Sequence, residues 1–162
     1  LGYDPYVSQE TVAPLGIRMV ALDDLLRESD VVTLHVVLTK ETRGMIGLRE
    51  LKLMKLTAFI INTSRGPAIK EVDLIQALNE KTIAGAALDV FDVEPTPLDN
   101  PLHAIDSMRL IMTPHIIGTN PGSQDAGQRM AAQSILSILD GKVPDTVVNP
   151  LAIPRWKERF GS

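Results

Sequence analysis

Three ionisable residues of the sequence, Arg65, Glu94 and His115, are of the types that bind a carboxylate and move a proton. The planar guanidinium of an arginine donates two parallel hydrogen bonds to a carboxylate. A histidine exchanges a proton near neutral pH, and a carboxylate within reach orients its ring and favours its charged form. Each of these residues, taken alone, is more simply explained as a solvated side chain. The functional interpretation therefore requires a fold that brings the three together.

Each of the three residues follows a segment with the composition of a buried strand. The run 58–61, Ala-Phe-Ile-Ile, predicts a strand buried on both faces, and a short polar stretch leads from it to Arg65. Two further apolar runs, 83–89 and 110–113, end shortly before the glutamate and the histidine. We therefore expect all three side chains near the carboxyl ends of strands.

The rest of the chain alternates between helical and strand patterns. This alternation predicts βαβ units, and hence an α/β fold with a doubly wound parallel sheet of the Rossmann type and helices on both faces. The N-terminal residues 1–4 resemble the last part of a strand. We predict helices at about 8–15, 22–29, 48–55, 71–80 and 123–139, and further strands at 18–20 and 31–36.

Right-handed crossovers place the carboxyl ends of all parallel strands at one edge of the sheet. Ligands of open α/β sheets bind at that edge. We expect it to collect Asp4, His35, Arg65 and Asp89, with His115 just past the last strand.

Composition narrows the classes of function. The 162 residues are about the size of one domain and long enough to bury a core. The formal net charge of −4 argues against nucleic-acid binding, which requires basic patches. No apolar run approaches the ~18 residues of a membrane span. The absence of cysteine excludes a thiol nucleophile, and three histidines without ligand-like spacing make a metal site improbable.

The ordered motifs of the chain resemble the D-isomer-specific 2-hydroxyacid dehydrogenases, the family of phosphoglycerate dehydrogenase. The resemblance covers nearly the whole chain, with its motifs in the family's order and spacing. The matching segments are 2–5 (Gly-Tyr-Asp-Pro), 34–39 (Leu-His-Val-Val-Leu-Thr), 61–66 (Ile-Asn-Thr-Ser-Arg-Gly), 84–91 (Ala-Gly-Ala-Ala-Leu-Asp-Val-Phe), 94–95 (Glu-Pro), 113–116 (Thr-Pro-His-Ile), 140–142 (Asp-Gly-Lys) and 147–150 (Val-Val-Asn-Pro).

The resemblance implies an oxidoreductase that transfers a hydride between NAD and C2 of a small D-2-hydroxy or 2-keto acid. It implies that Arg65 binds the substrate carboxylate, that His115 is the general acid/base, and that Glu94 is its partner. It also implies a cytoplasmic homodimer without nucleic-acid or membrane partners.

The same resemblance implies a set of cofactor contacts. Asp4 would accept hydrogen bonds from the adenosine ribose, and its charge would repel a 2′-phosphate, which favours NAD over NADP. Val36 would contribute a backbone contact, and Thr63 and Asp89 would lie near the nicotinamide ribose and carboxamide. Gly118 is the remaining cofactor residue implied.

Two of the chain's departures from the family pattern bear on function. The dinucleotide fingerprint Gly-x-Gly-x-x-Gly is absent, and Leu1 stands about where the second strand of the family's domain ends. We therefore expect 1–149 to be a partial dinucleotide-binding domain, incomplete at its N-terminus, and 150–162 a tail returning to an absent substrate domain. Such a chain by itself should neither turn over substrate nor bind NAD tightly. Ile117, bulkier than the family's small residue, should narrow the nicotinamide pocket.

Two alternatives remain at this point. An NAD(H)-responsive corepressor-like binding scaffold of the same fold keeps similar residues, and the upstream part of the protein would distinguish it from the enzyme. A formate dehydrogenase is disfavoured by Glu94, because those relatives resemble a Gln–His arrangement. The particular 2-hydroxy acid cannot be read from this sequence.

Overall fold

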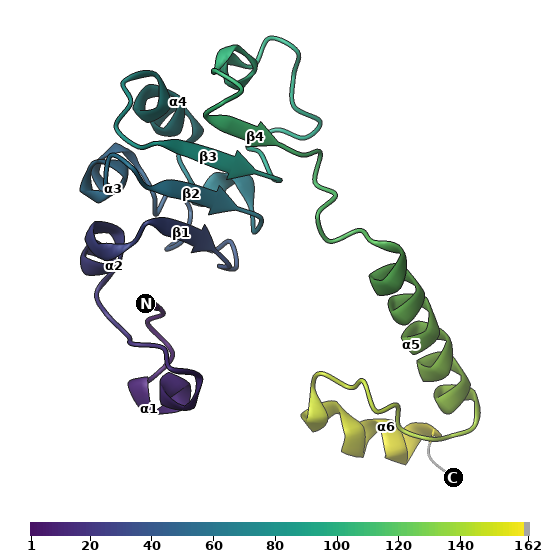
Figure 1. Cartoon of the computed structure of the whole chain (residues 1–162). Helices are drawn as coiled ribbons and strands as arrows, with labels where there is room; N and C mark the ends of the chain where they lie inside the picture. The colour runs from purple at the N-terminus through teal and green to yellow at the C-terminus, as the bar shows by residue number, and fades with distance from the viewer. Residues whose placement is uncertain (161–162) are drawn as a thin grey trace. The chain divides into compact units, whose positions relative to one another are not determined.

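The computed structural model describes residues 1–160 of the chain, which divides into two compact units between Ile117 and Gly118 (Figure 1). The first unit contains a single four-stranded sheet. Its strands are β1 (Val31–Leu34), β2 (Phe59–Asn62), β3 (Gly85–Leu88) and β4 (Leu110–Met112), all parallel and in the spatial order β1-β2-β3-β4. The predicted α/β fold with a parallel sheet is confirmed.

The register of the sheet aligns the carboxyl ends of the four strands. Leu34 lies opposite Asn62, Asn62 opposite Leu88, and Leu88 opposite Met112. The residues that follow the strands therefore start at one level of the same edge. This edge is the one at which the sequence predicts a site.

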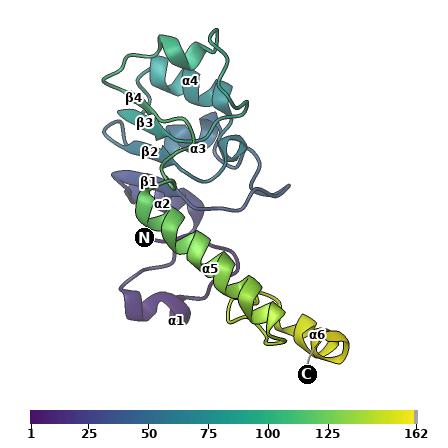
Figure 2. The ribbon, with the colours of Figure 1, turned by 90° about the vertical axis from the view of Figure 1, so that its right-hand side faces the viewer.

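Three helices lie along one face of the sheet in both views (Figures 1 and 2): α2 (Leu22–Glu28), α3 (Leu48–Leu53) and α4 (Glu71–Asn79). Side chains alternate between the two faces of a strand, so every second residue points to these helices. The core between the layers contains strand residues and helix residues that are at most 5% exposed: Val32, Leu34, Ile60, Ala86 and Leu88 from the strands, and Leu26, Leu51, Leu74, Ala77 and Leu78 from the helices.

The opposite face of the sheet is open within this unit. Val31 is 54%, Phe59 46% and Ile111 64% exposed. The prediction that the strand at 58–61 is buried on both faces is therefore wrong for Phe59. Helices cover one face of the sheet in the unit rather than both, because α2, α3 and α4 all pack on the same side.

The N-terminal segment is less regular than its pattern predicts. The helix expected at 8–15 is confirmed as α1 (Gln9–Val12) and a 3-10 turn (Ala13–Leu15), which ends at Gly16 in the left-handed region, with φ 71°. The strands expected at 1–4 and 18–20 reduce to one parallel bridge between Gly2 and Met19.

The second unit contains α5 (Pro121–Leu139), a 3-10 turn (Pro150–Ala152) and α6 (Ile153–Phe160). The Asn120 side chain accepts a hydrogen bond from the Ser123 N–H and so caps α5, confirming the predicted helix. The domain boundary predicted at residue 149 remains a prediction, and the last two residues of the predicted tail lie outside the described chain. Among residues 1–160, no helix is both long and apolar enough to cross a membrane.

Candidate active site

The turn after β2 presents Arg65 and is built on the buried side chain of Asn62, which is 1% exposed. The Asn62 amide donates to the Arg65 carbonyl at 2.9 Å, and its carbonyl oxygen accepts from the N–H and the hydroxyl of Ser64 at 3.1 and 2.9 Å. The Arg65 guanidinium is exposed and donates to the Ser64 carbonyl at 2.6 Å. The turn is thus fixed by Asn62, while the guanidinium faces solvent.

The end of β3 fixes the segment after β4 through one buried carboxylate. Asp89 is 3% exposed. One of its oxygens accepts from the Thr113 hydroxyl at 2.5 Å and the Ile116 N–H at 2.9 Å, and the other from the Ile117 N–H at 3.1 Å. Burial alone would raise the pKa of Asp89, but these hydrogen bonds and the nearby His115 outweigh it and lower the pKa below its ordinary value.

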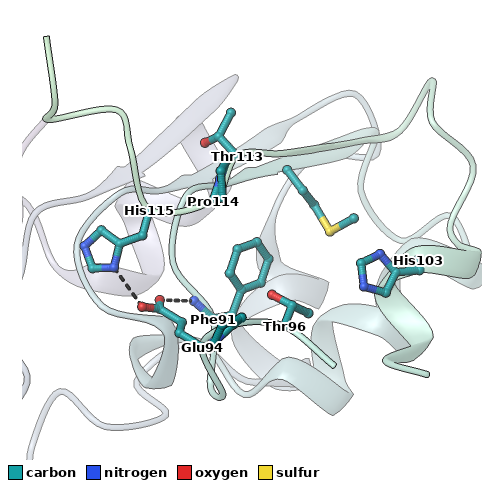
Figure 3. A pocket seen from close by; sticks show the side chains of 9 residues that line it. Phe91, Glu94, Thr96, His103, Thr113, Pro114 and His115 are labelled. Carbon is teal, nitrogen blue, oxygen red and sulfur yellow. Dashed lines mark hydrogen bonds and ion pairs between the residues drawn. The ribbon is translucent and has the colours of Figure 1, made fainter. Parts of the chain in front are cut away.

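His115 and Glu94 form a hydrogen-bonded pair, with 2.8 Å between His115 Nδ1 and Glu94 Oε2 (Figure 3). The other Glu94 oxygen accepts from the Phe91 N–H at 2.9 Å. The hydrogen bonds from His115 and Phe91, together with the charges of His115 and Arg65, outweigh burial and lower the pKa of Glu94. Glu94 is therefore an ionised acceptor at neutral pH, which assigns the proton of the pair to Nδ1.

The second ring nitrogen of His115 is open. Within residues 1–160, Nε2 has no hydrogen-bond partner, and the side chain is half exposed. His115 itself lies in the left-handed region with φ 52°, which is uncommon for a non-glycine residue. The hydrogen bonds that Asp89 accepts from the residues on either side of His115 hold the backbone in this conformation. The arrangement provides a fixed imidazole with one nitrogen available for proton transfer.

Two cavities of the first unit bear on the predicted site. One of about 690 Å³ adjoins the Glu94–His115 pair (Figure 3). The other, of about 540 Å³, lies at the carboxyl end of β1, and its lining includes Asp4 and Val36 but no lysine or arginine. The first is lined, besides the pair, by Phe91, Pro95, Thr96, His103, Met112, Thr113 and Pro114.

The second cavity is suited to the ribose of a nucleotide cofactor. One Asp4 oxygen accepts from the Tyr6 N–H at 2.8 Å, and a carboxylate has further acceptor sites for hydroxyl groups. A phosphate on the ribose would meet this negative charge without a basic side chain in the lining. The lining of this cavity thus carries acidic side chains but no lysine or arginine.

The structure brings some predicted site residues together and leaves others as predictions. Glu94 and His115 are in direct contact, and Asp89 holds the segment that carries the histidine. Thr63 is half-buried in the Asn62 turn, and its contact with the cofactor stays a prediction. Gly118 starts the second unit, and its predicted role is also untested.

Two further expectations concern Ile117 and metal binding. The Ile117 side chain is 61% exposed and its N–H is bound to Asp89, while its predicted effect on a nicotinamide pocket remains untested. In the part of the chain that the structure describes, no group of three or more acidic or histidine side chains is placed to hold a metal ion.

Sequence reasoning missed the supports of the site. The motif 113–116 assigns no role to Thr113, yet its hydroxyl donates to Asp89, and the backbone N–H of Phe91 donates to Glu94. Asn62 belongs to the short polar stretch before Arg65, and its side-chain amide is used within the turn. A polar residue at the last position of a buried strand is the signal that marks Asn62.

The parallel sheet, with polar side chains and a cavity at the carboxyl ends of its strands, is typical of an α/β domain that binds its ligand at that edge. Residues 1–117 match the family model of the D-isomer specific 2-hydroxyacid dehydrogenase NAD binding domain. The chain belongs to this family of NAD-binding oxidoreductases.

Known relatives agree with this assignment. The chain is 41% identical to a D-3-phosphoglycerate dehydrogenase of Methanocaldococcus jannaschii, covering 97% of the chain and 30% of that protein. It is 42% identical to a glyoxylate reductase of Thermofilum pendens, covering 86% of the chain and 40% of that protein. The chain thus spans less than half the length of these two relatives.

A solved structure shows the same fold. The D-isomer specific 2-hydroxyacid dehydrogenase of Lactobacillus delbrueckii ssp. bulgaricus, in its NAD-complexed form, matches with a TM-score of 0.76 and 30% identity. The match covers 91% of this chain and 47% of that one.

Replacement of Asp89 by asparagine should destabilise the protein in a pH-dependent manner. A carboxyl whose pKa is lowered on folding contributes stability above its unfolded value, about 3.9, and loses it as pH falls through the folded value. Asp89→Asn also replaces one acceptor oxygen by an NH2 group, which then faces at least one of the three N–H or O–H donors. We therefore expect the substitution to lower the free energy of unfolding by about 1–3 kcal/mol at neutral pH. Denaturant unfolding at about pH 7 and about pH 3 measures this. An equal wild-type-to-variant difference at both pH values would contradict it.

Proposed function

We propose that the protein is an NAD-dependent dehydrogenase of small D-2-hydroxy acids and their 2-keto counterparts. The observation that carries the proposal is the 2.8 Å contact between Glu94 and His115, which leaves Nε2 of the imidazole open. The proposal is also supported by family membership and by the names of the relatives, which are dehydrogenases and reductases.

In this proposal His115 exchanges a proton with the oxygen on C2 of the substrate. Because Glu94 fixes the proton on Nδ1, the proton for transfer is held on Nε2 in the charged ring. Glu94 also stabilises the charged imidazole during turnover. When bound, NAD supplies the hydride acceptor or donor of the reaction.

Arg65 is proposed to bind the substrate carboxylate. Its guanidinium is exposed beside the site, and its charge acts on Glu94. Two-point binding of the carboxylate would orient C2 with its oxygen towards Nε2. This orientation lets the same two residues serve any small 2-hydroxy acid.

The cofactor contacts are proposed as well. Asp4 would accept from the adenosine ribose, Val36 would contribute a backbone contact, and Thr63, Asp89 and Gly118 would lie near the nicotinamide end. For Asp89, the proposed contact uses the one lone-pair site of about four that its three protein donors leave free. We further propose a cytoplasmic homodimer, for which the family resemblance is the only support.

The full-length protein should oxidise NADH on addition of a 2-keto acid. The relatives suggest two substrates to compare, glyoxylate for reduction and D-3-phosphoglycerate for oxidation. We expect kcat/KM to be at least about 10-fold higher with NAD(H) than with NADP(H), because Asp4 disfavours a 2′-phosphate. The absorbance of the reduced nicotinamide measures both the turnover of each acid and the kcat/KM with each cofactor.

Three outcomes separate the hypotheses. Turnover with one of these acids supports the dehydrogenase and identifies its substrate. NAD binding without turnover of any 2-keto acid would contradict the proposal and favour the corepressor-like scaffold. A preference for NADP would show that Asp4 does not contact the ribose.

A further inference from the structure

The loop that carries Glu94 is pressed against the turn that carries Arg65. We call residues 89–100 the Glu94 loop. A Cβ atom added to Gly66 would come within 2.1 Å of the Phe91 carbonyl carbon and oxygen, and within 2.7 Å of the Asp92 nitrogen. Real Cβ atoms do not approach other atoms below about 3.0 Å. One side of the Glu94 loop therefore rests directly on the backbone of the Arg65 turn.

A second support of the loop is the carboxylate of Glu71, the first residue of α4. Its Oε1 accepts from the Asn100 side-chain amide at 2.9 Å, and its Oε2 accepts from the Asp92 N–H at 3.4 Å. The Asn100 side-chain oxygen in turn accepts from the Leu102 N–H at 2.8 Å and caps the 3-10 turn Pro101–Ala104. Glu71 thus spans the loop from residue 92 to residue 100.

The contact of Glu71 with the Glu94 loop places two carboxylates, those of Glu71 and Asp92, near each other. Burial and the charge of Glu71 raise the pKa of Asp92, while Arg43 acts in the opposite direction. Two carboxylates placed together disfavour each other unless other interactions hold them. Glu71 at the first position of α4 gains from the helix dipole, and its two hydrogen bonds add to this.

The position of Glu94 depends on the loop that Glu71 holds. Glu94 lies two residues after Asp92, and its carboxylate must reach both the Phe91 N–H and His115 Nδ1. The Glu94 side chain is 36% exposed, so packing alone does not fix it. A shift of the loop would lengthen the contact with His115.

We propose that Glu71 is a positioning residue that holds the Glu94 loop at the distance at which Glu94 binds His115. Glu71 contacts neither member of the pair and acts through the backbone of Asp92 and the side chain of Asn100. This inference rests on the proposed function, in which the Glu94–His115 pair transfers the proton.

A double-mutant cycle in the full-length protein tests the inference. Glu71→Ala should lower kcat about tenfold, the size expected for loss of a hydrogen-bonded support. In the Glu94→Gln background the same change should lower kcat less than about twofold, because the route to His115 is already interrupted. Glu71→Gln keeps the volume and one acceptor oxygen, so it should lie between wild type and Glu71→Ala. Additive losses in the two backgrounds would overturn the proposal.

The matched control is Glu80→Gln at the other end of α4. Glu80 is exposed, and its carboxylate accepts from Gln76 within the helix rather than from the loop. We expect its kcat and its pH–rate profile to equal those of wild type. Glu71→Ala should shift the pH–rate profile in the same direction as Glu94→Gln, which general loss of stability would not do.

A measurement without turnover separates this inference from the proposed function. The NMR signal of the His115 imidazole nitrogens reports its hydrogen bond to Glu94 whether or not the protein reduces 2-keto acids. Glu71→Ala should move that signal towards its position in Glu94→Gln, and Glu80→Gln should leave it in place. An unmoved signal in folded Glu71→Ala and Glu71→Gln would overturn the inference, while absence of turnover with a moved signal would count against the proposed function alone.

Discussion

The His115→Gln variant of the full-length protein should turn over 2-keto acids at least ~100-fold more slowly than wild type, the usual size of a general acid/base contribution. Glutamine can occupy the space of the ring and hydrogen-bond to Glu94, but it carries no proton that it can transfer near neutral pH. The loss should appear in kcat measured with saturating NADH. Near-normal turnover would show that another group transfers the proton.

A second variant guards against a purely structural explanation. His115 has a φ of 52°, a conformation that asparagine adopts more readily than most other residues. His115→Asn should therefore keep the backbone of the segment 113–117 with little strain and lose activity to the same extent. Thermal unfolding midpoints within a few degrees of wild type for both variants would show that the loss of activity comes from loss of proton transfer rather than from unfolding.

The Arg65→Gln variant should lower kcat/KM for 2-keto acids about 10- to 100-fold. This range corresponds to loss of hydrogen bonds between a guanidinium and a carboxylate, about 1.5–3 kcal/mol. Arg65 is exposed, and its guanidinium donates to the Ser64 carbonyl, so it can reorient towards a ligand without breaking the Asn62 turn.

Arg65→Lys distinguishes charge from geometry. Lysine retains the positive charge but lacks the planar pair of donors, so we expect it to restore only part of the loss. The measurement is the KM for the keto acid at saturating NADH, with the Kd for NADH as the control that should not move. An unchanged KM in both variants would remove Arg65 from the substrate site.

The carboxyl-edge arrangement could be predicted because it follows from local patterns. Apolar runs end shortly before Arg65, Glu94 and His115, and parallel topology then requires a shared edge. The helices 22–29, 48–55 and 71–80 were found from their periodicity to within two residues. The family motifs point to the same three side chains, Arg65, Glu94 and His115.

The remaining features depend on contacts between distant segments and could not be read from local patterns. The exposure of Phe59 depends on where three helices pack, and the role of Asp89 depends on donors 24 to 28 positions away. The support from Glu71 similarly joins residues 21 and 29 positions apart. No single-sequence pattern marks such hydrogen bonds, because aspartate, glutamate and asparagine are most often solvent-exposed residues without such partners.

The order of the strands in the sheet has a consequence for how the protein folds. Each strand pairs with the next strand along the chain. The segments that connect successive strands are therefore of similar, modest length. Such sequential pairing keeps contact order low for a parallel sheet and allows stepwise growth from β1 to β4 during synthesis. β4 docks last in this order, and the Asp89 bonds to Thr113, Ile116 and Ile117 form only when it does. In this order the Asp89 bonds that support the segment carrying His115, the proposed proton-transfer residue, form after the other strands have paired, and they are lost when β4 detaches.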